Sequence, residues 1–132
     1  MRRLVVIAAA LALSACGTAQ SSNDVKFTGA KKDVADLVDK LATAGQRHDA
    51  STICNDILSK QLLTELKSAG GDCESEMKDA IADATDYDLQ VRSVKIDGNT
   101  ATAQVRQGDK GEVATFTFVK ENGGWRASAL GG

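Results

Sequence analysis

Residues 94–105 read VKIDGNTATAQV and decide the fold of this chain. Apolar and polar side chains alternate on both sides of a central DGN, which is a strong signal for a tight β-hairpin turn. After the turn, Ala101, Ala103 and Val105 share one parity, so we expect all three to face inward. The stretch therefore predicts two neighbouring antiparallel strands.

The hairpin continues toward the C-terminus as a meander. The turn-forming stretches QGDKG and ENGG separate two more alternating segments, EVATFTFVK at 112–120 and WRASAL at 125–130. In the first of these, Phe116 and Phe118 lie on one face. The second half of the chain thus predicts a four-stranded antiparallel sheet.

In the strand that precedes the hairpin, the apolar residues shift from odd to even positions partway along. Leu89 and Val91 alternate with polar residues on one parity, and Val94 and Ile96 continue on the other. An extra residue near Ser93 would bring all four side chains to the same face, so we expect a β-bulge there.

Upstream of residue 86 the apolar period is that of helices. Residues 31–47 carry apolar side chains at i, i+3, i+4 and i+7, which predicts a long amphipathic helix. A second helix is expected over 49–58, with Asp49 as its N-cap; Ser59 and Asp72 are expected to cap a third and a fourth. The fold class is therefore α+β, with helices followed by the sheet.

The N-terminus has the pattern of an export signal. Arg2 and Arg3 precede ten apolar residues at 4–13, too few for a membrane-spanning helix, which needs about 20. Such a run fits the hydrophobic region of a signal peptide, so we expect residues 1–15 to be removed. The polar stretch GTAQSSNDVK that follows Cys16 reads as a flexible tether.

Residues 13–16, LSAC, resemble the lipobox of bacterial lipoproteins, and the overall composition resembles that of actinobacterial proteins. The resemblance implies cleavage before Cys16 and a diacylglycerol attached to its sulfur. Residues 16–30 would then form the lipidated cysteine and tether, with the membrane as partner through that lipid. The expected location is the cell membrane, lipid-anchored and facing outside the cytoplasm.

Lipidation of Cys16 leaves Cys54 and Cys73 as a pair. In an oxidising compartment two remaining cysteines favour a disulfide, which here would join the second helix to the fourth. A structural metal would need further ligands, and the single His48 does not supply them at a recognisable spacing. We therefore expect a disulfide and neither a metal nor a cofactor.

Over residues 31–132 the chain resembles the nuclear transport factor 2-like superfamily. The resemblance is carried by AGQRHDASTIC, GGDCES, VKIDGNTATAQV and ENGGWRASAL. It implies a curved sheet wrapped around the first helix, giving a cone with an internal cavity. It implies no single activity, because this fold hosts isomerases, cyclases, dehydratases and binding modules. Residues that would line the cavity are Tyr87, Phe116, Phe118 and Trp125.

No group of residues forms a convincing catalytic site. His48 and Asp49 are sequence neighbours, which do not face each other on a helix, so we expect no dyad. A net charge of −2 without basic clusters argues against nucleic-acid binding. The expected function is a non-catalytic module that binds an apolar small molecule or a protein partner. The alternative is a small cyclase- or isomerase-type enzyme acting on an apolar substrate in the cone.

Overall fold

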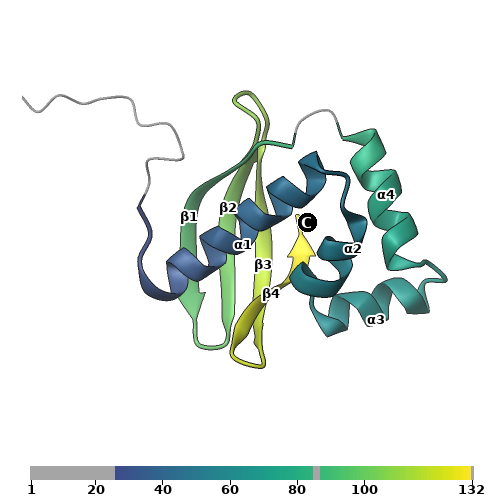
Figure 1. Ribbon diagram of the computed structural model, residues 1–132. Coiled ribbons are helices and arrows are strands. Elements are labelled where there is room, and N and C mark those ends of the chain that lie inside the picture. Colours follow the sequence, from purple (N-terminus) through teal and green to yellow (C-terminus); the bar gives the residue numbers. More distant parts are fainter. Residues whose placement is uncertain (1–25, 85–86, 132) are drawn as a thin grey trace, which may run out of the picture.

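The computed structural model describes residues 26–84 and 87–131. The predicted signal peptide, Cys16 and most of the tether lie outside these residues. Within them the chain is α+β, as the sequence predicts, with its helices preceding its sheet (Figure 1). The helical elements are α1 (Gly29–Gln46), α2 (Ala50–Thr52), the π-helical turn η2 (Ile53–Ile57), α3 (Lys60–Ser68) and α4 (Cys73–Asp83).

The sheet is an antiparallel meander in the order β1-β2-β3-β4, which confirms the predicted hairpins. Its residues alternate between a buried inner face and a polar outer face, as expected for an antiparallel sheet covered on one side. The strands are β1 (Leu89–Asp97), β2 (Thr100–Gln107), β3 (Val113–Glu121) and β4 (Gly124–Leu130).

The hydrophobic core lies between the inner face of the sheet and α1, which crosses that face (Figure 1). Val34 and Val38 of α1 are completely or almost completely buried, and so is Phe118 at the centre of β3. Opposite them, small residues such as Ala101 and Ala103 let the helix approach the strands closely. The core is therefore mainly aliphatic, with few aromatic rings.

The shorter helices gather at the β4 edge of the sheet (Figure 1). Leu58 forms a parallel bridge with Ala127, and the backbone N–H of Ser59 donates to the Ala127 carbonyl at 2.8 Å. The edge of β4 is thus covered by the chain itself over this stretch.

The predicted second helix is interrupted. After three α-helical residues the chain widens into η2, where the Leu58 N–H donates to the carbonyl of Ile53, five residues back, at 3.0 Å. Leu58 then leaves the helix in an extended conformation and pairs with Ala127. The requirement to reach β4 explains why a regular helix does not continue here.

Two β-bulges interrupt the pairing of the sheet, one in each edge strand. In β1, Val91 and Ser93 pair with consecutive residues of β2, which leaves Arg92 as the extra residue and confirms the predicted bulge. A second bulge, which the sequence did not reveal, leaves Ser128 unpaired in β4. Because of it, Leu130 pairs with Phe116 and shares its inner face.

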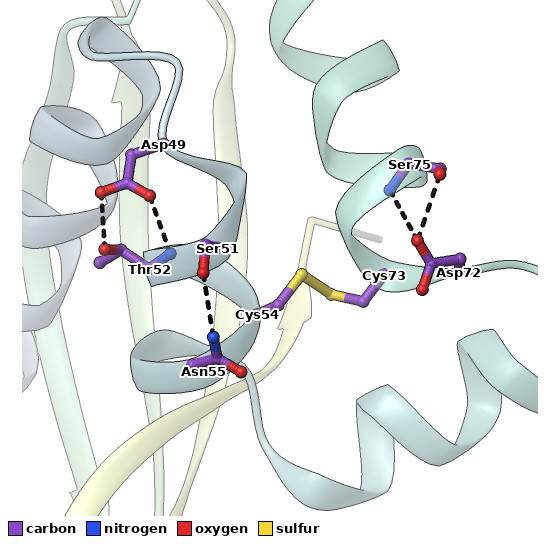
Figure 2. The surroundings of a disulfide bond; sticks show 8 residues. All are labelled: Asp49, Ser51, Thr52, Cys54, Asn55, Asp72, Cys73 and Ser75. Atoms are coloured by element: carbon purple, nitrogen blue, oxygen red, sulfur yellow. Dashed lines mark hydrogen bonds between the residues drawn. A yellow bond between two sulfur atoms is a disulfide. The ribbon is translucent and has the colours of Figure 1, made fainter.

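The predicted helix caps are confirmed. The carboxylate of Asp49 accepts a hydrogen bond from the Thr52 N–H at 3.0 Å, and Ser59 Oγ accepts one from Leu62 at 3.1 Å. Asp72 similarly accepts from the N–H of Ser75 (Figure 2). In the described part of the chain, no helix is long and apolar enough to cross a membrane.

Candidate functional site

A disulfide joins Cys54 to Cys73, as predicted (Figure 2). It connects η2 to the first residue of α4 across a sequence separation of 19 residues. The bond holds α4 against η2, although α4 itself buries few side chains; among its residues Cys73–Asp83 only Ile81 is fully buried. The disulfide therefore fixes the position of an element that packing alone holds weakly.

Next to this crosslink lies a pocket of about 150 Å³, open to solvent on one side, which we call the α1–α4 pocket. It forms where the C-terminal half of α1, η2 and α4 meet the end of the sheet at which β1 begins and β4 ends. The helices contribute Leu41, Ala42, Gly45, Ile53, Met77, Ala80, Ile81 and Ala84, and the sheet side contributes Tyr87, Leu89, Gln107 and Leu130.

Tyr87 is held in place from three sides. Its hydroxyl donates to the carbonyl oxygen of Ile81 at 2.5 Å, near the end of α4. Its ring lies against Gly45 of α1, where an added Cβ would come within 3.1 Å of Tyr87 Cδ1. The His48 ring meets it edge-on, with centroids 5.8 Å apart. A glycine at position 45 is what lets the ring line the pocket.

His48 and Asp49 have different partners, so the structure does not bring them together as a dyad. His48 lies just after α1 and has a left-handed backbone conformation, with φ of 55°; its ring contacts Tyr87. The Asp49 carboxylate accepts from the hydroxyl of Thr52 at 2.7 Å and from its N–H (Figure 2). Both hydrogen bonds favour the ionised carboxylate and so hold the pKa of Asp49 below its usual value. The bond from the Thr52 hydroxyl has the larger effect.

The four residues predicted to line a cavity are placed differently from one another. Tyr87 lines the α1–α4 pocket. Phe116 and Phe118 are packed in the core under α1. Trp125 is 8% exposed and lines a separate groove with Leu37 of α1, and its ring lies 5.7 Å from Lys120 Nζ.

Sequence reasoning did not identify Gly45, Met77 or Leu130 as lining residues. For Met77 a signal existed, because it belongs to the apolar stripe of the fourth predicted helix. A glycine inside a helical pattern, such as Gly45, also indicates a close approach. Leu130 had no such signal, since its direction depends on the bulge at Ser128.

The described side chains that line the pocket are almost all apolar. Among the described residues that line it, none is Asp, Glu, Lys, Arg or His; Gln107 supplies an amide and Tyr87 a hydroxyl that already donates to Ile81. A charge buried there would find no counter-charge, at a large cost in free energy. An apolar cavity of about 150 Å³ can hold a molecule the size of benzene.

Within residues 26–84 and 87–131 there is also no group of three or more His, Cys, Asp or Glu placed to hold a metal ion. Comparison of the chain with protein-family models, with curated proteins and with solved structures finds no match.

Proposed function

We propose that this protein is a membrane-anchored extracytoplasmic lipoprotein whose nuclear transport factor 2-like domain binds a small apolar ligand. The observation that carries the binding function is the open α1–α4 pocket, whose described lining residues include no charged side chain. The order of elements, with a long α1 crossing one face of a four-stranded meander, is consistent with that domain type.

The proposed location rests on LSAC at 13–16 and is supported by the disulfide. A bond between Cys54 and Cys73 is typical of proteins that fold in an oxidising compartment. Lipid on Cys16 would hold the domain at the membrane surface, since two acyl chains are enough for stable anchoring.

The lining of the pocket favours binding over catalysis. A cyclase or isomerase needs an acid or base within hydrogen-bonding reach of the substrate. The one ionisable group among the described lining residues is the Tyr87 hydroxyl, and its proton is directed at the Ile81 carbonyl. The alternative of a small enzyme acting on an apolar substrate therefore receives less support.

The anchor is tested by mass spectrometry of the native protein and by membrane fractionation. We expect a mature chain that begins at Cys16, carries diacylglycerol and sediments with membranes, and a Cys16→Ala variant that carries no diacylglycerol and retains residues 1–15. A mature chain cut elsewhere, or one without lipid, would disprove the lipoprotein assignment.

Binding is tested with toluene as the probe, on the mature chain from residue 16 carrying Cys16→Ser, so that no lipid or detergent is needed. We expect saturable NMR shifts of the methyl groups of Met77, Ile81 and Leu89, and a rise in Tm because the ligand binds only the folded state.

Two alanines of α4 offer a matched pair. Both side chains are exposed, but Ala80 lines the pocket and Ala82 does not, so Ala80→Leu should reduce the shifts and Ala82→Leu should retain them. Shifts that spread evenly over the protein, or none at all, would contradict the proposal.

A further inference from the structure

The α1–α4 pocket is too small for a whole ligand of ordinary size, yet it is open on one side. Its volume of about 150 Å³ matches roughly six carbon atoms, the content of a benzene-sized cavity. A larger ligand would place only one end inside, with the rest in solvent. The apolar lining requires that the inserted end be hydrocarbon.

The walls suit an aliphatic chain. Leu41, Leu89 and Leu130 present branched aliphatic groups from three different elements, and Met77 adds an unbranched side chain that adapts to the shape of its neighbour. The one aromatic wall, Tyr87, is fixed by Gly45 and Ile81.

From these observations we infer that the ligand is a straight-chain amphiphile, which inserts about six carbons of its alkyl chain and leaves its polar head in solvent. This inference rests on the proposed function of the pocket and specifies the class of ligand. The head would meet no charged residue among the described lining residues, so its charge should matter little, whereas the length of the chain should matter strongly.

The proposed anchor offers a source for such a ligand. In the sequence only residues 17–28 separate Cys16 from α1, so an anchor at Cys16 would keep the domain close to a bilayer. The protein's own lipid would be attached beyond the N-terminal end of α1, whereas the pocket lies along the C-terminal half of that helix. We therefore assign the pocket to a free amphiphile and test the protein's own lipid as the competing occupant.

The test is a chain-length series. Straight-chain carboxylates and alcohols of four to ten carbons are titrated by calorimetry into the mature chain from residue 16 carrying Cys16→Ser. Each added methylene should tighten Kd about fourfold until about six carbons are buried, after which Kd should level off. Carboxylate and alcohol of equal length should differ by less than about threefold at physiological salt.

The matched variants sharpen the prediction. Ala80→Leu adds three carbons to the wall and leaves room for about three carbons of the ligand, so Kd should no longer tighten between four and six carbons, while Ala82→Leu should keep the wild-type plateau. The lipidated protein in nanodiscs should bind hexanoate as the Cys16→Ser chain does. Loss of binding there would show that the protein's own acyl chain fills the pocket and would overturn the assignment to a free ligand.

The failure of this inference differs from the failure of the proposed function. If toluene binds but Kd is independent of chain length, or continues to tighten beyond eight carbons, the amphiphile is excluded and the pocket remains a binding site. Discrimination between carboxylates and alcohols by more than tenfold would exclude it equally. If neither toluene nor the series binds, the proposed function itself is wrong.

Discussion

The sheet and the helical segment after α1 are stabilised in different ways. Each strand of the sheet pairs with its neighbour in sequence, and inner residues such as Val105 and Phe118 are almost completely buried. Along its described length, α3 has no fully buried residue, and α4 has one, Ile81. Partly buried side chains such as Leu62 and Met77 pack against the core, and helix caps and the disulfide add to these contacts.

The difference shows which region is held by many mutually supporting contacts and which depends on a few specific interactions. The sheet and α1 share a core, whereas α4 is tied to η2 by the Cys54–Cys73 disulfide and α3 lies between these two crosslinked elements in the chain. The α1–α4 pocket lies at the boundary between these regions, with walls from both. Loosening the helical region should therefore alter the pocket before it unfolds the sheet.

The largest effect is expected from Phe118→Ala, which removes a buried ring at the point where sheet and α1 meet. The cavity should lower the free energy of unfolding by about 3–5 kcal/mol. Urea denaturation followed by circular dichroism and by Trp125 fluorescence should show one shared transition. Thr117→Ala, at a neighbouring residue on the outer face, serves as the control and should change stability by about 0.5 kcal/mol or less. A loss below 1 kcal/mol for Phe118→Ala would show that the sheet does not depend on this core.

Removing the disulfide should separate the two regions. Cys54→Ala with Cys73→Ala opens a loop of about 20 residues and should cost about 3 kcal/mol on the chain-entropy model. Native-state hydrogen exchange should show the greatest loss of protection in α3 and α4. Reduction of the wild-type protein by dithiothreitol is the control, and it should give the same pattern. An equal loss in β2 and β3 would mean that the crosslink supports the whole domain rather than its helices.

A smaller effect is expected at Ser59, which is fully buried and caps α3. Ser59→Ala leaves the Leu62 N–H without its acceptor and should destabilise the protein by about 1 kcal/mol in thermal or urea unfolding. Ser68→Ala, at the exposed end of the same helix, should have little effect. Equal effects from both variants would argue against a special role for the cap.

The smallest effect concerns pH. The pKa of Asp49 is lower in the folded protein than in the unfolded chain, so its contribution to stability is complete above the unfolded pKa of about 4. As pH falls further, the unfolded state binds the proton first and the contribution is lost through the folded pKa. Asp49→Asn retains a capping residue without the titration. The Tm of the variant should therefore fall less steeply below pH 4 than that of the wild type; parallel curves would contradict the assignment.

The parts of the fold that could be predicted from sequence are those that depend on nearby residues. The hairpin turn at 97–99, the caps at Asp49, Ser59 and Asp72, and the bulge beside Ser93 each follow from a short local pattern. The disulfide followed from the cysteine count once Cys16 was assigned to the lipid.

The parts that could not be predicted depend on partners distant in sequence. The π-helical turn η2 exists because Leu58 must reach Ala127, and the bulge at Ser128 is defined by pairing with β3. The pocket requires both, together with the approach of Tyr87 to Gly45. The alternation of the first strand was enough to predict that Tyr87 lines a cavity. It was not enough to predict which side chains surround it.

The coverage of the β4 edge has a consequence for how copies of this protein behave when crowded. Exposed strand edges are templates for pairing between molecules. Here Leu58 and Ser59 occupy part of the edge of β4, and the opposite edge, β1, carries the bulge at Arg92 and the exposed Lys95. Both edges therefore resist strand addition, so neighbouring molecules at high surface density can lie side by side without merging their sheets into an aggregate.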